Sequence, residues 1–513
     1  MHPRKFIRDS VGFAFAQYVV RAALMLRGLV AARLIGPEAF GAWSALQMMM
    51  EYGTLPLLGT QQGLDQMVPP RMVSGDAAAL RRVKRAALFN ILLLTSLFVV
   101  ACVGWVTLGS SRLLGAWGPW GLVLALVCVA AINIANYQTS IQRSHGDFKT
   151  VSGWMLLQGA IGAFAGLALT PWLGGWGLLL GWTAGCIAAL VFSTVRSRAN
   201  APMSPAVAQE GLDLVQVGFP MFVLIASALV MRSLDRLIIL RYLGNRDFGF
   251  YSISMMAMTF LLYMPDAVTY VMYPRLLRQF DEDGRDPKGI RELAERFIRI
   301  SSLIVPAFSA MVFLAAMPVV ELLLPKFVPG VGALQALCFG AIGLGFGNFA
   351  SVVLMTLGRQ TMLMPTALVS IGVGAALDLT AIKLGYGITG VAWATLATYA
   401  INGAILLSMA LTGLGLSGRG MLAAIGRLFL PLVLSIALAW GLEHFLPGAD
   451  ASLWQRMLRM LGSMMLFVAL YTLAVRPLAR GIGIRQMLSE FNLPVISPLL
   501  RRFGGGASSR DKS

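Results

Sequence analysis

The feature that most constrains this chain is a series of apolar runs, each long enough to cross a lipid bilayer. About 20 apolar residues in a helix match the ~30 Å hydrocarbon core of a membrane. Such runs recur along most of the 513 residues, of which 57% are hydrophobic and only 12% are charged. The sequence therefore excludes a soluble domain and predicts an all-α integral membrane protein.

We predict fourteen membrane-spanning helices, with both termini in the cytoplasm. Cytoplasmic loops retain Lys and Arg, and these residues favour the side of the N-terminus by roughly four to one. The net charge of +18 therefore indicates topology and gives no support for nucleic acid binding. The predicted spans are 11–32, 40–58, 86–108, 119–139, 151–169, 176–195, 214–240, 248–268, 297–317, 332–357, 362–384, 391–414, 422–442 and 457–475.

Two inner loops carry signals for the start of a helix. Asp76 is a predicted N-cap, and Asp286 is another, followed by Pro287 at the first helical position. We expect both segments to form separate amphipathic helices on the inner leaflet, with solvated connectors as the alternative. The C-terminal segment 477–513 is predicted to be a cytoplasmic tail that is partly disordered.

One short linker occurs twice. "RLIGPEAFGAWS" at 33–44 is followed 208 residues later by "RYLGNRDFGFYS" at 241–252, and other short motifs recur at similar offsets. The repeat predicts two parallel six-helix bundles around a central cavity, at 1–200 and 206–414, with two additional helices at 420–476. Gly permits a tight turn in each linker, and Phe with Trp or Tyr anchors it at the membrane surface.

Charged residues inside the first spans are candidates for function. A charge at a helix centre costs about 2.5–3.5 kcal/mol on insertion scales, so such residues are rare without a role. Arg21 lies about 15 Å into its span at 1.5 Å per residue. Gln17, Arg21 and Gly28 share one helical face, which we take to face the cavity. Arg27 lies at another angle and nearer the outside.

Later spans add further polar side chains. Gln47 and Glu51 belong to a polar stripe that also contains Trp43 and Thr54, and Arg232, Asp235 and Arg236 can interact along one helix. Two structural alternatives stay open, an Arg21–Glu51 pair and an Arg232–Asp235 pair. The predicted substrate-binding residues are Gln17, Arg21, Arg27, Gln47, Glu51, Asn133, Asn136, Arg232 and Arg236.

Four segments together resemble one transporter family. They are "RLIGPEAFGAWS", "DRLIILRYLGNRDFGFYS", "QRSHGDFK" and "GYGITGVAWATLATY". They are similar to the polysaccharide-export flippases of the multidrug/oligosaccharidyl-lipid/polysaccharide exporter superfamily, which are related to the lipid II flippases. The resemblance implies transfer of undecaprenyl-pyrophosphate-linked sugar units from the inner to the outer leaflet of the bacterial cytoplasmic membrane by alternating access. It also implies that the last two spans help to hold the polyprenyl tail. We expect a monomer surrounded by membrane lipids.

The polar residues suit such a substrate. Arg binds a diphosphate in bidentate form, and Gln, Asn and Thr bind sugar hydroxyls. We expect no enzyme activity, no metal site and no cofactor, because the sequence shows no catalytic triad, metal-ligand cluster or P-loop. We expect the energy for transport to come from a gradient of H⁺ or Na⁺ or from the substrate gradient itself, with Glu51, Asp235 and Asp378 as candidate ion carriers.

Three other functions compete with this interpretation. A drug or organic-cation exporter of the same superfamily would need cavity acids without facing arginines. A sugar polymerase or ligase would need a long outer loop, and the outer loops here are short. A scaffold without transport would not need Arg and Glu in the middle of the membrane.

Overall fold

The chain folds into helices throughout the described residues. The computed structural model describes residues 3–107, 117–196, 208–444 and 453–479, and all its secondary structure there is helical. In this part of the chain, 12 helices are long and apolar enough to cross a membrane. The first two predicted spans, 11–32 and 40–58, correspond to the two halves of α1 (Pro3–Tyr52), which Gly36 divides, and the second span extends six residues past the end of this helix. The predicted all-α membrane fold is confirmed, and residues 480–513 of the predicted tail lie outside the described ranges.

The helix bounds agree with the predicted spans. No predicted span from the third onward overhangs its helix by more than one residue. The long helices after α1 are α2 (Thr60–Val73), α3 (Ala77–Thr107), α4 (Gly118–Ser144), α5 (Phe148–Leu173), α6 (Gly175–Val195), α7 (Ala208–Tyr242), α8 (Asn245–Glu282), α9 (Pro287–Leu323), α10 (Val331–Thr356), α11 (Leu363–Lys383), α12 (Gly387–Gly413), α13 (Gly418–Glu443) and α14 (Leu453–Ala479). Short 3₁₀ helices are η1 (Leu55–Leu57), η3 (Pro325–Gly330) and η4 (Gln360–Met362).

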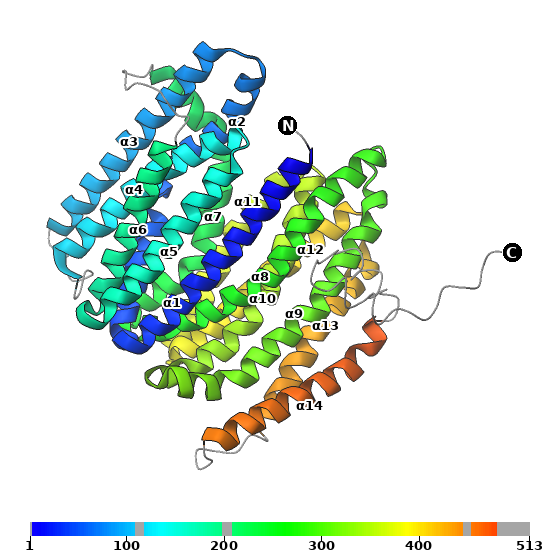
Figure 1. Ribbon diagram of the computed structural model, residues 1–513. Coiled ribbons are helices and arrows are strands. Elements are labelled where there is room, and N and C mark those ends of the chain that lie inside the picture. The colour runs from blue at the N-terminus through cyan, green and yellow to red at the C-terminus, as the bar shows by residue number, and fades with distance from the viewer. Residues whose placement is uncertain (1–2, 108–116, 197–207, 445–452, 480–513) are drawn as a thin grey trace.

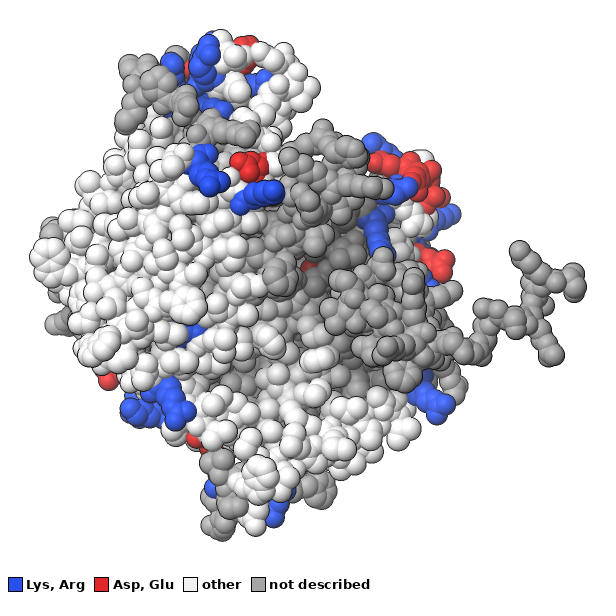
Figure 2. Space-filling model, viewed as in Figure 1, with Lys and Arg blue, Asp and Glu red and all other residues white. Residues whose placement is uncertain are grey.

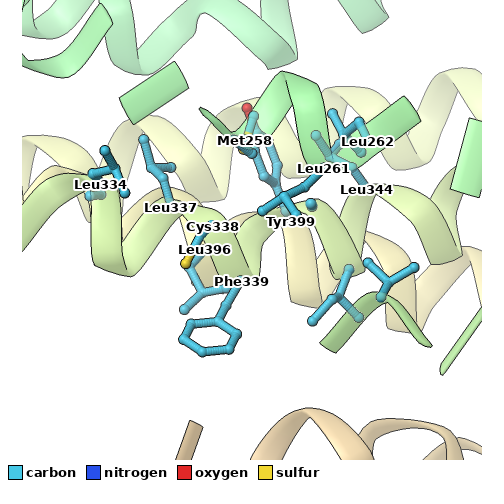
Figure 3. Packing of buried hydrophobic residues seen from close by; sticks show 14 of the residues in the cluster. Met258, Leu261, Leu262, Leu334, Leu337, Cys338, Phe339, Leu344, Leu396 and Tyr399 are labelled. Atoms are coloured by element: carbon cyan, nitrogen blue, oxygen red, sulfur yellow. The ribbon is translucent and has the colours of Figure 1, made fainter. Parts of the chain in front are cut away.

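The helices form two groups with α1 between them. Figure 1 shows α3, α4, α5 and α6 on one side, which we call the first group, and α8, α9, α10 and α12 on the other, which we call the second group. Helices α13 and α14 lie at the outer edge of the second group. Helix α10 is the core of the second group, since 89% of its span is buried. A helix that is apolar on all faces must be enclosed by other helices. Figure 3 shows side chains such as Leu337, Met258 and Tyr399 interlocking there.

The repeated linker has the same backbone conformation in both copies. Gly36 has φ 79° and ψ 174°, and Gly244 has φ 87° and ψ −174°. This region of backbone space is essentially restricted to glycine, because a side chain would clash with the chain. Each copy therefore turns the chain sharply between two helices, as the sequence predicts.

The two linkers also pack against each other. A methyl group at Gly41 would lie 1.8 Å from the carbonyl oxygen of Asn245, and one at Gly249 would lie 1.9 Å from that of Pro37. Gly41 corresponds to Gly249 in the repeat, and Pro37 corresponds to Asn245. Each copy thus presents its glycine to the same position of the other copy, and only glycine permits this approach of two backbones.

The two predicted N-caps are present, but the helices they start are not separate. Asp76 accepts hydrogen bonds from the backbone of Ala78 and Ala79 at 3.0 and 2.8 Å, and Asp286 accepts one from Lys288 at 3.0 Å. The Ala79 amide lowers the pKa of the Asp76 carboxyl below its usual value. Both segments continue unbroken into α3 and α9, so the prediction of separate surface helices is wrong. No proline or glycine interrupts either junction.

Helix α2 is an element that the sequence did not reveal. Its interior contains Pro69 and Pro70, which normally argue against a helix. Contacts with α7 compensate, because the two backbones touch at glycines. A methyl group at Gly63 would lie 2.0 Å from the Leu214 carbonyl oxygen. Tertiary packing here outweighs local helix propensity.

Charged side chains gather at the two ends of the molecule and leave a broad uncharged belt (Figure 2). We call the end at which α3, α5, α7, α9, α11 and α13 begin the basic end, because it carries most of the Lys and Arg. It is uppermost in Figure 1. An uncharged belt of this kind is the surface that a bilayer requires of a spanning protein.

Helices α13 and α14 are attached to the second group by polar contacts. Arg456 at the start of α14 pairs with Glu321 of α9 at 2.5 Å, and the Tyr471 hydroxyl donates to the Leu303 carbonyl oxygen at 2.8 Å. Gln335 of α10 donates to a Glu443 carboxylate oxygen at the end of α13. These contacts fix the additional helices to the second group.

Candidate functional site

A cavity of about 480 Å³ lies between α1, α7 and α8. The sequence marked α1 and α7 as its walls through their charged residues, and α8 forms the facing wall. Six predicted substrate-binding residues line it together: Arg21, Arg27, Gln47, Glu51, Arg232 and Arg236. The first half of α1, its second half and α7 contribute two residues each. We call this space the central cavity.

Arg21 stands over an aromatic ring of α8. Its guanidinium carbon lies 4.9 Å from the centre of the Tyr263 ring. A ring face attracts a cation but leaves the edge of the guanidinium group able to donate hydrogen bonds. No carboxylate of the described residues pairs with Arg21, so its charge is available to a ligand.

Arg27 is buried between two indole rings. It is 4% exposed, and its guanidinium carbon lies 5.4 Å from the Trp43 ring and 5.1 Å from the Trp182 ring. One nitrogen donates to the Gly162 carbonyl oxygen at 3.4 Å, and its Nε has no partner among the described residues. The second tryptophan comes from α6, which the sequence had not assigned to the site.

Glu51 pairs with an arginine of α7. Its carboxylate lies 3.4 Å from Arg236, whose side chain is 18% exposed against 49% for Glu51. This finding contradicts the alternative of an Arg21–Glu51 pair. A hydrogen bond between Tyr52 and Ser233 joins the same two helices. The contact of α1 with α7 therefore depends on polar groups.

The other structural alternative, an Arg232–Asp235 pair, is also absent from the described part of the chain. Arg232 donates instead to the Asn348 side-chain oxygen at 3.2 Å. Asp235 turns into the second group, where it is 2% exposed and accepts from the Tyr251 hydroxyl. A buried carboxylate needs hydrogen-bond donors, and the Tyr251 hydroxyl and the Arg236 backbone amide supply them to Asp235.

Asp266 is a cavity residue that sequence reasoning missed. It accepts from the Asn348 amide at 2.9 Å, which places Arg232, Asn348 and Asp266 in one hydrogen-bonded series. Asp266 also lies within the predicted span 248–268. An acidic residue inside a predicted span was therefore the signal that could have found it.

Two predicted residues that the structure describes, Asn133 and Asn136, stand apart from the central cavity. Asn133 is buried and donates to the Gly53 carbonyl oxygen and the Thr95 hydroxyl, both at 3.1 Å, which is a packing role within the first group. Asn136 does not line the cavity. The side chain of Gln17 lies outside the described residues.

Asp235 and Asp378 line a second, smaller cavity inside the second group. Its volume is about 10 Å³, which is room for one water-sized species. Asp378 is 2% exposed, and its Oδ1 has no hydrogen-bond partner among the described residues. The hydroxyl of Thr395 lies 3.4 Å from Asp235. Two carboxylates and a hydroxyl around so small a space are the oxygen ligands that a cation requires.

An apolar pocket adjoins the central cavity. It has a volume of about 250 Å³, lies between α1, α8 and α9, and has only apolar side chains in its lining. Met25 and Met256 line both spaces. A ligand with a polar head and a hydrocarbon chain would have a place for each part.

Arginines outnumber acids in the central cavity. Arg21, Arg27, Arg232 and Arg236 face Glu51 and Asp266, which leaves an excess of two positive charges when all six are ionised. Such a chamber attracts an anion and repels a cation.

Replacing Glu51 with glutamine removes the partner of Arg236. For the transport that the sequence resemblance implies, we expect a lower rate at normal membrane abundance, because Arg236 then stays unpaired and the α1–α7 contact weakens. The charge reversal Glu51→Arg with Arg236→Glu should restore part of the activity, measured as flux per unit of inserted protein. Equal transport by Glu51→Gln and the parent protein would show that this pair has no role in transport.

Comparisons with known proteins give a family and a fold. The family model described as "Polysaccharide biosynthesis protein" matches residues 30–326. No curated protein sequence matches the chain. A structure of lipid II flippase MurJ in an inward closed conformation matches with a TM-score of 0.70 at 13% identity, covering 92% of this chain and 100% of that one.

Two further structures share the fold. An inward-facing multidrug resistance MATE family transporter of the MOP superfamily has a TM-score of 0.61 at 16% identity, over 77% of this chain and 94% of that one. A MOP superfamily transporter from Pyrococcus furiosus has a TM-score of 0.55 at 16% identity, over 80% and 95%.

Proposed function

Because the chain belongs to the polysaccharide biosynthesis protein family, we propose that it is a flippase for a lipid-linked sugar. Its substrate is an undecaprenyl-pyrophosphate-linked oligosaccharide or polysaccharide repeat unit. The flippase carries this substrate from the inner to the outer leaflet of the bacterial cytoplasmic membrane by alternating access, in the synthesis of a cell-surface polysaccharide.

The observation that supports this proposal most is that a polar, arginine-lined cavity and an apolar pocket adjoin each other. Four arginines line the central cavity, and Arg21 among them has no carboxylate partner in the described residues to compete with a pyrophosphate. The adjoining apolar pocket offers hydrocarbon contacts to a polyprenyl chain. The side chains of Gln47 and Ser44 supply further polar groups for the sugar. A carrier for a water-soluble anion would need the first space but not the second.

The proposal is tested in a bacterial strain that lacks its own repeat-unit flippase. Expression of this chain should restore surface polysaccharide and remove the accumulated lipid-linked precursor. Each is quantified after extraction and compared with an empty vector. Normal membrane abundance without restoration, across strains with different repeat units, would overturn the proposal.

Export of organic cations is the second candidate, because MATE family transporters share the fold. The excess of arginine in the central cavity disfavours it. Ethidium accumulation in the same strains separates the two functions. Faster ethidium efflux with no change in surface polysaccharide would favour the exporter.

The direction of transport requires the basic end to be cytoplasmic. In a cysteine-free background, Asn245→Cys should react with an impermeant maleimide added to intact cells, because Asn245 begins α8 at the opposite end. Gly284→Cys, in the exposed turn before α9, should react only after the cells are permeabilised. Labelling of Gly284→Cys in intact cells would reverse the proposed topology.

We further propose that H⁺ or Na⁺ couples transport through Asp235 and Asp378. Asp378→Asn removes one negative oxygen beside the small cavity, so we expect loss of the stimulation that an imposed ion gradient gives to substrate flux. Asp281→Asn, at an exposed position of α8, serves as the control. Full gradient stimulation in Asp378→Asn would remove this residue from the coupling site.

A further inference from the structure

A further cavity lies away from the central one and has a larger volume. Its volume is about 670 Å³, and it is enclosed by α9, the turn between α12 and α13, α13 and the end of α14. None of its lining residues lines the central cavity. It lies at the basic end, on the part of the molecule that Figure 1 shows farthest from α3–α6.

Two helix faces build this cavity at regular spacing. Residues 291, 295, 298, 299 and 302 form one face of α9, and residues 420, 423, 424, 427 and 428 form one face of α13. Gly420 and two alanines on the α13 face are small, which leaves the space open. Apolar side chains such as Leu428 and Pro431 share the lining with four charged residues, Arg291, Glu295, Arg299 and Arg427.

The lining of this cavity contains three arginines and one acidic residue, which pairs with two of them. Glu295 pairs with Arg291 at 2.8 Å and with Arg299 at 3.0 Å. Arg427 of α13 has no ion pair or hydrogen bond with any residue that the structure describes. The net charge of the lining is therefore two positive charges, from three arginines and one glutamate.

The depth of Arg427 makes its missing partner informative. It lies nine residues after the start of α13 at Gly418, or about 13 Å along the helix axis. An arginine at this depth is costly unless an anion or water meets it. Arg427 is exposed, so this anion is either a soluble phosphate or a lipid headgroup, and the apolar side chains of the lining favour the lipid.

We propose that this cavity binds the headgroup of an anionic phospholipid from the inner leaflet. The phosphodiester accepts hydrogen bonds from Arg427 and Arg299, and an acyl chain lies along the apolar wall formed by residues such as Leu428 and Pro431. The lipid thereby bridges α9 and α13 and fastens the additional helix pair to the second group.

Charge disfavours the chain's own C-terminal segment as the occupant. Residues 480–513 contain six Lys or Arg and two Asp or Glu, so the segment is itself basic. A basic segment would be repelled by the arginines of the cavity but would add to the attraction of an anionic leaflet.

The test measures lipid binding by the full-length protein in nanodiscs of phosphatidylcholine. Phosphatidylglycerol is added in steps, and retained lipid and melting temperature are recorded. We expect saturable binding and a higher melting temperature. Arg427→Gln should weaken the binding about tenfold, since one charge-assisted hydrogen bond is lost. Arg419→Gln, on the same helix but outside the cavity, is the matched control.

Binding measurements with two other ligands identify the class of molecule that occupies the cavity. Inorganic phosphate should bind far more weakly than phosphatidylglycerol, because it lacks the acyl chains. Undecaprenyl pyrophosphate should bind equally well to the parent protein and to Arg427→Gln, because its site is the central cavity. Unchanged phosphatidylglycerol binding in Arg427→Gln would overturn the proposal. An equal loss of undecaprenyl pyrophosphate would overturn it too, by making the cavity a substrate site. Neither result depends on whether the chain flips sugars.

Discussion

Replacing Arg21 with alanine is expected to lower the initial rate of substrate flipping about a hundredfold, and replacing it with lysine about tenfold. Arg21 lines the central cavity with no carboxylate partner among the described residues. Its planar group can give two parallel hydrogen bonds to a pyrophosphate, whereas lysine provides only a point charge. The rate is measured in vesicles at a substrate concentration below saturation.

Arg33 provides the control for this pair of variants. It lies on the same helix, is exposed and does not line the cavity, so Arg33→Ala and Arg33→Lys should flip at the parent rate. Since Glu51 pairs with Arg236, loss of activity in Arg21→Ala cannot come from an acid left without its arginine. An Arg21→Ala protein that keeps the parent rate would exclude Arg21 from substrate binding.

Features of the fold that depend on local sequence were predictable. Apolar length located the spans, the N-cap signals located the start of α9 at Asp286, and the repeated glycines located the turns at Gly36 and Gly244. Each of these depends on residues close together in the chain. Helix α2 was not predictable, because contacts with α7, far along the chain, stabilise it against its own prolines.

The central cavity was predictable in part for a similar reason. A charge inside an apolar span is visible in the sequence, which is how Arg21, Arg232 and Glu51 were found. The partner of each charge is not visible, because it depends on how helices rotate against one another. The ring of Tyr263, which lies beneath Arg21, belongs to α8. Nothing in the sequence indicated this contact, because the apolar and aromatic residues of α8 look like those of an ordinary hydrophobic core.

The second large loss of transport is expected from a substitution at the contact between the two linkers. Gly41→Ala places a methyl group 1.8 Å from the Asn245 carbonyl oxygen. Both sides of this contact are backbone, so no side chain can turn aside, and the linkers have to separate. Overpacking of this kind costs about 1–3 kcal/mol, which is roughly ten- to hundred-fold in the population of the state with touching linkers.

In the alternating-access cycle that we propose, this contact forms and breaks, and an equilibrium between two such states shifts by the difference in their free energies. Gly41→Ala and Gly249→Ala should therefore each reduce transport about tenfold or more. Spin labels at the exposed positions Glu38 and Arg246 should report a longer distance between the linkers. Gly372→Ala is the control, because a methyl group there meets no atom within 4 Å. Unchanged distances with reduced transport would mean that the glycines act in some way other than closing this end. Unchanged transport would mean that the protein works without the close contact, and the repeated linker would then serve only to turn the chain.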